Sequence, residues 1–572
     1  MSNIRPYLWA FLAALLFLNY QAWMHDYAST EQAASTPSTT GTASGGAASL
    51  AASVPNLDAA STATTPSVAT AAPAPATPPP IAAANSVAAL DAGGPSIHVR
   101  TDVLDLQINL KGGELDQADL LAYPLHKDQP NAPVRLLNHD SEATLYVLQS
   151  GLVGKGDDAP THLATWTSPS TSYVLAPDAK ELRVPLTWTD GHGLQVTKTF
   201  VLQRGDYAVA LDYDIRNDGT TPRELATYAQ ILRHWEPAKR SYFDVETYSF
   251  KGPAVWNGKK AIDLKVEDAA DAKFSDVVTN GWIAALQHHF VSAIVPTPDE
   301  PFTYQLSIIG KEFLLRATGP TLTLAPGSDT KVAEQLFVGP KLQAQLAATG
   351  PELQRTVDYG RLTVLSQPLF ATLKWVHGLI GNWGWSIIIV TALIKLIFFP
   401  LSQASGRSMA KMRAVGPRMK QIQETFKDDR EKLGRAMMDL YKKEKINPLA
   451  GCLPMVIQIP FFISFYWVLL ESVEMRQAPF MLWINDLSAR DPYFVLPLLM
   501  GGAMFAQFKL NPAPPDPMQA KIMQFMPLVM TGMMAWFPSG LVLYWLTNTV
   551  LSIAQQWYVN RVVETEAAKR RS

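Results

Sequence analysis

Lys395 is the residue whose type and position most clearly point to chemistry, because it is the one charged side chain in the apolar run from Trp383 to Pro400. An ionisable side chain inside a membrane span is costly and by default marks a functional site. Lys395 lies five residues before Pro400, so its ammonium could instead extend along its alkyl stem to the lipid headgroups. The sequence leaves both interpretations open.

Uncharged polar side chains lie at comparable depths in the same run and in other apolar runs. In lipid such groups need hydrogen-bond partners. Hydrogen bonds between helices explain each of them singly, whereas a shared hydrated groove explains why so many accompany one cation. The predicted polar lining of this groove is Thr391, one turn before Lys395, together with Gln458, Thr547, Asn548 and Ser552.

Other kinds of chemistry are disfavoured by composition and spacing. A single cysteine, Cys452, permits no internal disulfide and no cysteine-based metal cluster, and neither a His-Glu-x-x-His spacing nor a phosphate-binding glycine loop occurs. With 48 basic and 50 acidic residues, the net charge of -2 lacks the basic footprint of a nucleic-acid-binding protein. We therefore expect no catalytic residue, no metal, no cofactor and no DNA partner.

The composition indicates a membrane protein. Charged residues make up 17% of the chain, against about 25% in soluble domains. The run from Pro6 to Met24 carries no charge and approaches the ~20 residues that span a bilayer; a cleaved signal peptide is the alternative. Residues 28–95 are almost entirely Ala, Ser, Thr, Pro and Gly, a composition that cannot bury a core and predicts a disordered linker.

Residues 96–346 have the patterning of β-hairpins. Strand-like runs extend from Leu182 to Trp188, from Leu194 to Leu202 and from Tyr207 to Ile215, and glycine-containing turns separate them. Consecutive hairpins of this kind predict a large antiparallel β-sandwich. A domain of roughly 250 residues is large enough to be stabilised by its core without disulfides.

The chain from Ser366 onward is predominantly apolar and predicts five further spans. Segment 402–447 holds twelve Lys or Arg and the tail after Asn560 holds four, whereas the loop 471–491 holds two. By the positive-inside rule, the segment and the tail are cytoplasmic. The expected topology has six transmembrane helices, both termini in the cytoplasm and the β domain in the periplasm.

Motifs within roughly the last 200 residues resemble the YidC/Oxa/Alb family of membrane protein insertases, in its long Gram-negative form. The match is specific because it combines several separate blocks. They include Ser366-Gln367-Pro368-Leu369-Phe370, Gly381-Asn382-Trp383-Gly384, Phe399-Pro400-Leu401, Asn447-Pro448-Leu449, Gln458-Ile459-Pro460, Arg476-Gln477-Ala478-Pro479-Phe480, Asp516-Pro517-Met518-Gln519 and Phe537-Pro538-Ser539-Gly540-Leu541.

The resemblance implies a protein that inserts inner-membrane proteins and helps them fold, alone or with the Sec translocon, without ATP hydrolysis. It implies a hydrophilic groove, open to the cytoplasm and lipid and closed toward the periplasm, with a central arginine whose position is taken here by Lys395. Lysine keeps the charge but lacks the planar fork that binds carboxylates in a bidentate manner. The family's substrate contacts correspond to Gln458, Phe462, Tyr544 and Trp545, of which Trp545 stands where relatives often have tyrosine.

The implied partners are nascent membrane proteins, the Sec translocon, membrane lipids, and the ribosome through the cytoplasmic hairpin and basic tail. The β domain resembles the supersandwich of sugar mutarotases.

The predicted domains are a transmembrane anchor (1–27), a disordered linker (28–95), a periplasmic β-sandwich (96–346), a connector with an interfacial amphipathic helix (347–381), an insertase core of five transmembrane helices (382–560) that includes a cytoplasmic helical hairpin (402–447), and a basic cytoplasmic tail (561–572).

Two other classes of protein are alternatives. A membrane-tethered sugar-modifying enzyme would place its activity in residues 96–346. A secondary transporter would bind a small solute at Lys395, but the sequence has no inverted repeat and no paired broken helices.

Overall fold

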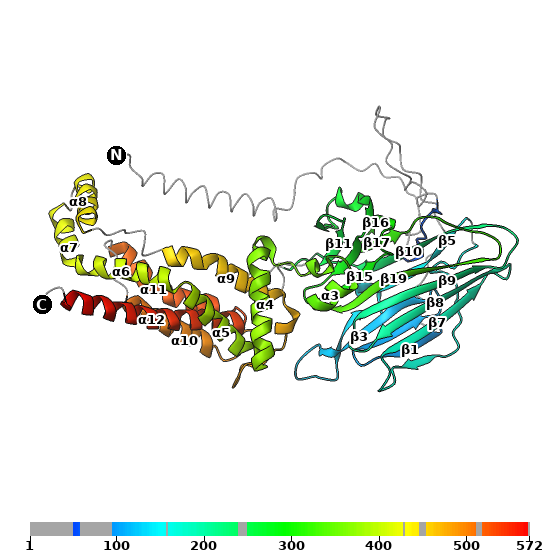
Figure 1. Ribbon diagram of the computed structural model, residues 1–572, viewed down its shortest axis with the longest axis horizontal. Coiled ribbons are helices and arrows are strands. Elements are labelled where there is room, and N and C mark those ends of the chain that lie inside the picture. The colour runs from blue at the N-terminus through cyan, green and yellow to red at the C-terminus, as the bar shows by residue number, and fades with distance from the viewer. Residues whose placement is uncertain are drawn as a thin grey trace, which may run out of the picture. The chain divides into compact units, whose positions relative to one another are not determined.

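The structure is a computed structural model that describes residues 50–57, 94–155, 158–237, 249–426, 429–444, 453–510 and 517–569 (Figure 1). The predicted first span, most of the predicted linker, Cys452 and the last residues of the basic tail lie outside the described residues. The expectations for those segments therefore stay predictions.

The larger of two sheets has eleven strands. Their order is β13-β16-β17-β10-β5-β3-β2-β1-β6, with β18 beside β10 and β4 beside β3. The strands are β1 (Ser96–Arg100), β2 (Leu104–Asn109), β3 (Glu114–Pro124), β4 (Pro133–Leu137), β5 (Tyr146–Gly154), β6 (Ser172–Val174), β10 (Arg223–His234), β13 (Ser275–Thr279), β16 (Pro301–Ile309), β17 (Glu312–Thr318) and β18 (Leu322–Leu324).

The second sheet has eight strands in the order β12-β11-β14-β15-β19-β9-β8-β7. The strands are β7 (Glu181–Thr189), β8 (Leu194–Gln203), β9 (Ala208–Asn217), β11 (Gly252–Trp256), β12 (Ala261–Asp263), β14 (Trp282–Leu286), β15 (Phe290–Val295) and β19 (Ser328–Pro340). Strands β7, β8 and β9 contain the three predicted hairpin segments, and Leu182 pairs with Leu202 in antiparallel register. Buried residues of both sheets share one core, so the predicted β-sandwich is confirmed.

Two features depart from the sequence-based description. The short strand β6 pairs with β1 in a parallel direction, so the sandwich is not wholly antiparallel. Within the predicted linker, residues 50–57 begin with a 3-10 turn, and Leu50 and Leu57 are buried against the larger sheet. The expectation that no part of residues 28–95 joins a core is thus wrong for this segment.

Helices form the part of the chain that follows β19 (Figure 1). They are α3 (Gln343–Thr349), α4 (Thr363–Ile380), α5 (Trp383–Ile397), α6 (Phe399–Ala414), α7 (Gly416–Thr425), α8 (Arg430–Lys443), α9 (Leu453–Glu471), α10 (Val495–Leu510), α11 (Pro517–Met534) and α12 (Ser539–Lys569). Helix α4 is the predicted amphipathic helix. Its Leu369, Leu373 and Val376 are buried where it packs on α5 and α9, while Ile380 at its C-terminal end is 43% exposed.

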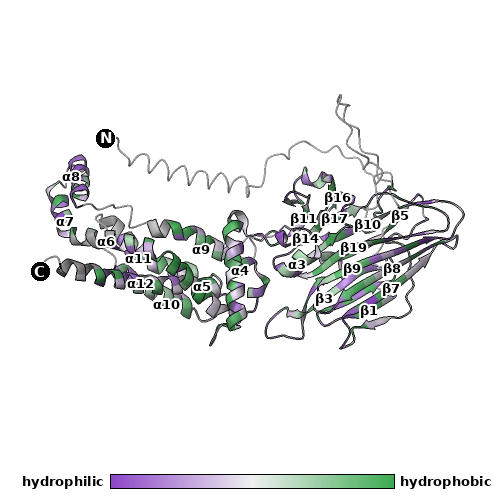
Figure 2. Ribbon diagram, viewed as in Figure 1, coloured by the Kyte–Doolittle hydropathy of each residue, from purple (hydrophilic) through white to green (hydrophobic). Residues whose placement is uncertain are grey.

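Among the described helices, no single one is both long and apolar enough to cross a bilayer alone, although α5 and Phe399–Arg407 of α6 meet that requirement together, with a bend of 61° between them. Ile457–Glu471 and Val495–Leu510 are shorter apolar helices. Figure 2 shows hydrophobic residues along α5, α9 and α10 and hydrophilic residues along α8. The six predicted spans stay a prediction.

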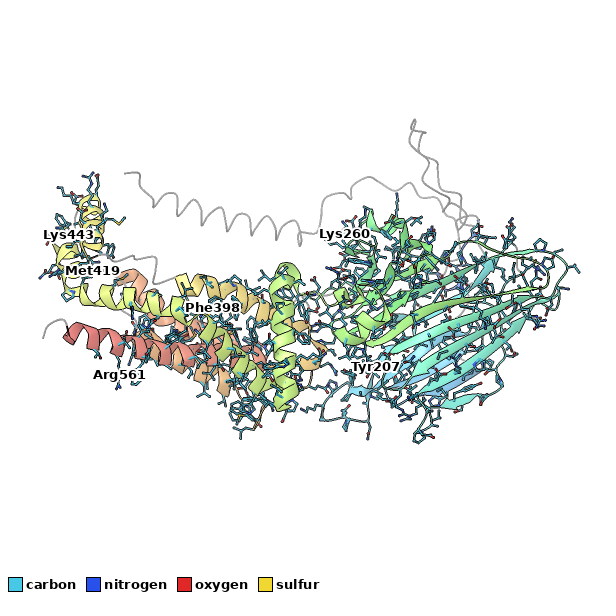
Figure 3. All side chains as sticks on the ribbon, viewed as in Figure 1. Tyr207, Lys260, Phe398, Met419, Lys443 and Arg561 are labelled. Carbon is cyan, nitrogen blue, oxygen red and sulfur yellow. The ribbon has the colours of Figure 1, made fainter. Side chains whose placement is uncertain are left out.

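In its described residues, the charged segment after α5 has three helices rather than the two that we expected. Helix α6 ends at Ala414, and α7 begins at Gly416 with Pro417 in its first turn, where proline is tolerated. Helices α7 and α8 then pack through Val415, Met419 and Leu440. The labels Met419 and Lys443 locate this pair in Figure 3.

Candidate functional site

The site begins with the packing of α5 on α12. The Asn382 side chain accepts a hydrogen bond from the Trp385 N–H at 3.1 Å and so caps the start of α5. In the last turn of the same helix, Lys395 is half-buried, and its Nζ donates to Ser552 Oγ of α12 at 2.7 Å. Ser552 Oγ in turn donates to the Asn548 carbonyl at 2.7 Å. The ammonium is therefore held against a polar part of α12.

The polar residues of α12 form a stripe along one helix face. Asn548, Ser552 and Gln555 are four and three residues apart, a spacing that places side chains on one face. Gln555 was not among the predicted residues, although this spacing could have found it. Its side-chain nitrogen is buried and has no hydrogen-bond partner among the described residues. Thr547, which was predicted, is half-buried beside this stripe.

The two remaining predicted polar residues are placed differently. Thr391 is 1% exposed, and its hydroxyl donates to the Ile387 carbonyl of its own helix at 2.6 Å. Gln458 lies half-buried on α9. The structure thus brings Lys395 together with Ser552 and the Asn548 carbonyl, and it satisfies the Thr391 hydroxyl within α5.

Phe462, Tyr544 and Trp545 lie in one aromatic cluster where α9 meets α12. The Phe462 ring is 4.6 Å from the Trp545 ring in an edge-on arrangement and 6.2 Å from the Tyr544 ring. Phe465, which the sequence analysis missed, stacks on Tyr544 at 4.4 Å. Its spacing of three residues from Phe462 is the signal that could have found it. Tyr544 and Phe465 are buried, so the half-buried rings of Phe462 and Trp545 are the accessible part of the cluster.

Large apolar residues are exposed on the outside of the bundle. An exposed apolar surface of this extent is typical of proteins that meet a membrane or another partner. The residues are Leu393, Leu396 and Ile397 on α5, Leu498, Leu499 and Phe505 on α10, and Phe525, Leu528 and Val529 on α11. At the bend between α5 and α6, Phe398 lies edge-on to Phe461 of α9 at 5.2 Å (Figure 3).

The opposite end of α5 is covered by the loop between α9 and α10. Asn382 Nδ2 donates to the Phe480 carbonyl at 2.9 Å. A Cβ added at Gly384 would lie 2.0 Å from the Phe480 ring, so this close approach requires glycine. The loop also accepts the Ser539 N–H at the Ala489 carbonyl, at 2.7 Å, where α12 begins. At this end the loop therefore packs directly on the starts of α5 and α12.

The described part of the β domain has buried ionisable residues, among them His288 and His289. His288 and His289 stack with their ring centroids 3.8 Å apart, and His288 Nε2 lies 2.9 Å from the Leu470 carbonyl at the end of α9. Burial lowers the pKa of His288 to about 3, which keeps it neutral at physiological pH. Within the described ranges, no cluster of three or more His, Cys, Asp or Glu could hold a metal ion.

Comparison with known proteins adds evidence of a different kind. Residues 96–372 match the family described as YidC periplasmic domain, and residues 375–567 match the family described as 60Kd inner membrane protein. The chain is 44% identical to the membrane protein insertase YidC of Thioalkalivibrio sulfidiphilus over 100% of both chains, and 43% identical to that of Nitrosococcus oceani over 99% of this chain and 100% of the relative.

Among solved structures, the chain is similar to an active YidC insertase crystal structure with the first transmembrane domain resolved. The identity is 18%, the TM-score is 0.36, and the match covers 82% of this chain and 96% of that one. The assignment to a family rests on the sequence relatives.

Proposed function

The chain belongs to the YidC family of inner-membrane protein insertases, and from that premise we propose how it inserts its substrates. It is an inner-membrane protein with a periplasmic domain, and insertion is a non-enzymatic function. We propose six transmembrane helices with both termini in the cytoplasm, and the division of the chain that the sequence predicts. The span containing α5 with the start of α6, and the helices α9, α10, α11 and α12, then form the insertase core.

In this proposal, Lys395 is the central cation of a hydrophilic groove that is open to the cytoplasm and lipid. Its contact with Ser552 joins α5 to α12 at the polar stripe. A positive charge there attracts the acidic side chains of an exported tail. Since lysine is a point charge with three donors rather than a planar fork, the attraction is general and not specific for one carboxylate geometry.

Thr391, Gln458, Thr547, Asn548 and Ser552 are the proposed polar lining. A groove that holds water lets the polar part of a substrate enter without full desolvation, which lowers the cost of crossing the apolar core. Such entry needs no ATP hydrolysis, because transfer of the substrate's ~20 apolar residues into lipid supplies the driving force.

The apolar part of a substrate would leave along the aromatic cluster of Phe462, Tyr544 and Trp545. These rings lie beside the polar stripe on α9 and α12, so a segment that moves from groove to lipid meets polar and apolar contacts in turn. The closure around Asn382 and Phe480 supports a groove that is closed toward the periplasm.

Proposed partners are nascent membrane proteins, the Sec translocon, the ribosome and membrane lipids. The segment 402–447 and the tail from Arg561 are rich in Lys and Arg. Basic clusters of this kind bind both RNA phosphates and anionic headgroups, which is the basis for proposing the ribosome and lipids as partners of the hairpin and tail.

One observation carries the groove proposal, namely the half-buried Lys395 ammonium at 2.7 Å from Ser552 Oγ of α12. This contact with a second helix favours a position inside the bundle over one at the headgroups. The polar stripe of α12 surrounds the contact with further groups that could bind water or substrate.

The test is depletion of this protein in its host, complemented with wild type, Lys395→Arg or Lys395→Ala. Insertion of a single-span reporter with a short acidic exported tail is scored by protease protection. We expect Lys395→Ala to lose at least about tenfold in insertion, the scale of one lost charge-assisted interaction, and Lys395→Arg to restore it.

Lys374→Ala is the matched control, because Lys374 is an exposed lysine on α4 and should leave insertion unchanged. If Lys395→Ala and Lys374→Ala inserted the reporter equally well, Lys395 would be a headgroup contact and the groove proposal would be wrong.

A further inference from the structure

Residues 50–57 are packed on the β domain although they lie within a low-complexity sequence. Leu50 is 3% exposed and Leu57 is 4% exposed. Leu50 packs with Leu145, Val147, Leu232 and Leu314. Leu57 packs with Val153, Ala226 and Tyr228. Two leucines seven residues apart thus occupy two separate apolar patches.

The patches lie on the face of the larger sheet that points away from the main core. Side chains alternate between the two faces of a strand. In β10, Leu225, Ala229 and Ile231 belong to the main core, whereas Ala226, Tyr228 and Leu232 contact the segment. Residues 50–57 therefore cover apolar side chains on a sheet face that is not packed in the sandwich interior.

A ladder of polar side chains crosses four strands on the same face, from Glu114 of β3 to Arg316 of β17. Gln149 of β5 donates to Glu114 at 2.8 Å, and Gln230 of β10 donates to Gln149 at 2.7 Å. Arg316 of β17 donates through Nε to Gln230 at 2.7 Å. Its Nη2 donates to the Ser53 carbonyl and, at 3.2 Å, to Ser53 Oγ. The ladder ends on the backbone of the segment.

His162 binds the segment at a second backbone position. The Tyr228 hydroxyl accepts the His162 backbone N–H at 2.9 Å and lies 2.6 Å from His162 Nδ1. His162 Nε2 lies 2.9 Å from the Ala51 carbonyl, so the neutral tautomer with a proton on Nε2 donates to it and leaves Nδ1 to accept from Tyr228. Two side chains of the domain thus make hydrogen bonds to two main-chain carbonyls of the segment, those of Ala51 and Ser53.

We propose that this face of β5, β10 and β17 is a peptide-binding site whose resident ligand is the chain's own segment Leu50–Leu57. Recognition combines two apolar patches for leucine side chains with Arg316 and His162 as donors to main-chain carbonyls between them. In such a site, hydrogen bonds to the peptide backbone supply affinity and pockets for side chains supply specificity. The site does not depend on the proposed insertion route.

Occupation of the site shortens the tether of the β domain. Between the predicted end of the first span at Met24 and Leu50 there are about 25 residues, against about 71 up to Ser96. A fully extended chain covers at most ~3.4 Å per residue, so docking reduces the greatest reach from roughly 240 Å to roughly 85 Å. The bound segment therefore lowers the upper limit on the distance between the β domain and the predicted end of the first span.

The first test measures maleimide labelling of single cysteines in the purified full chain carrying Cys452→Ser. Leu57 is buried and its neighbour Asn56 is exposed, so Leu57→Cys should label at least tenfold more slowly than Asn56→Cys. Adding Leu50→Ser should bring the Leu57→Cys rate toward that of Asn56→Cys. Equal rates in the parent background would overturn the proposal.

The second test supplies the ligand in trans. A fluorescent synthetic peptide of residues 48–59 is titrated into the full chain carrying Leu50→Ser and Leu57→Ser. Saturable binding is expected, with at least tenfold weaker binding to wild type, because the tethered copy competes at a high effective concentration. Arg316→Gln in the double-serine background should weaken binding.

The control peptide has serine in place of both leucines. No binding of the parent peptide, or equal binding of parent and control peptides, would show that the segment packs on the domain without being a recognised ligand. Displacement of the labelled peptide by an apolar exported segment of a substrate would keep the site and change its principal ligand, so it would overturn the assignment to residues 50–57.

Discussion

The β domain and the helical core each contain a lysine away from open solvent, and the two are satisfied to different degrees. Lys198 of β8 is 0% exposed, and its ammonium donates to the Gly113 carbonyl at 2.6 Å, the Ser150 carbonyl at 3.0 Å and the Gly112 carbonyl at 3.4 Å. Lys395 is half-buried and, within the described part of the chain, makes one hydrogen bond, to Ser552.

An ammonium group has three donors, so Lys198 uses all of them within the fold. Three aromatic rings, those of Trp166, Phe200 and Tyr213, also lie within 6 Å of its Nζ. Burial lowers the pKa of Lys198 to about 7. A lysine enclosed in this way holds structure together, whereas one with a single partner keeps donors for water or a substrate.

Lys198→Ala is expected to have the largest effect on the free energy of unfolding, and it tests whether an enclosed lysine stabilises the fold. The substitution leaves buried carbonyls without a donor and creates a cavity, which together should cost about 3 kcal/mol after the relief of ammonium desolvation. The free energy of unfolding is measured by urea denaturation of the purified full chain, followed by tryptophan fluorescence. Lys395→Ala should change it by less than about 1 kcal/mol while it reduces insertion.

Lys331→Ala is the control for Lys198→Ala. Lys331 lies on β19 with its side chain 75% exposed, 3.3 Å from Asp214, and an exposed pair of this kind contributes little. If Lys198→Ala were as stable as Lys331→Ala, enclosure of a lysine would not be evidence of a structural role, and the contrast with Lys395 would lose its basis.

The second comparison concerns the two ends of α5, one closed around Gly384 and one carrying Lys395. Gly384→Ala places a methyl group into the Phe480 ring and should destabilise the protein by about 2 kcal/mol. Thermal unfolding in detergent measures the loss. Phe480→Ala in the same chain should recover part of it, because the two sites are in direct contact.

Gly378→Ala serves as the reference for that experiment. A Cβ at Gly378 of α4 meets nothing within 4 Å, so alanine should be neutral or slightly stabilising in the helix. Loss of stability at both glycines, with no recovery from Phe480→Ala, would contradict a specific closure at Gly384.

The sequence predicted these regions to different extents, and the reasons are physical. Strands β7 to β9 were predictable because their patterning and turns are local. Lys395 stood out because one charge interrupts an apolar run, and its contact with Ser552 lies between two residues that the sequence had already selected. Gln555 and Phe465 were missed, although both follow selected residues by three positions on the same helix.

Residues 50–57 were missed because composition averages over a long segment and hides two leucines. The signal was present in the strands as well, since β5 and β10 carry apolar residues at positions of both parities. An antiparallel sheet with one solvated face would alternate. The segment lies about 90 residues before β5 and about 165 residues before β10, and no local rule connects it to them, so the contact is a property of the fold.

A smaller effect concerns His162, which contacts the docked segment through the Ala51 carbonyl. Burial lowers the pKa of His162 to about 4, and the charge of Arg316 contributes to the lowering. Between pH 6.5 and 4 the unfolded chain binds more protons at this residue. The free energy of unfolding should therefore fall as pH falls through this window, by about 1 kcal/mol per unit.

His162→Gln should flatten that slope in urea denaturation at several pH values, whereas His192→Gln, in an exposed turn, should not. Burial raises the pKa of Glu114 and Glu334 to about 7, so they give the opposite slope between pH 4.5 and 7 in all three proteins. The difference between variants isolates the imidazole. Identical slopes for the His162→Gln variant and its parent would remove His162 as the source.

The smallest expected effect comes from Ser552→Ala, which tests whether α12 positions Lys395. Ser552→Ala removes the hydrogen-bond partner of Lys395 but keeps its charge, so insertion of the short-tailed reporter should fall only about two- to fivefold, as expected for one hydrogen bond. In the Lys395→Ala background the same change should have no further effect, because the two residues act together.

Ser464→Ala is the control, since the Ser464 hydroxyl is buried without a partner among the described residues. Equal losses in the presence and absence of Lys395 would mean that Ser552 acts on the substrate independently, and the lysine would then work without being positioned by α12.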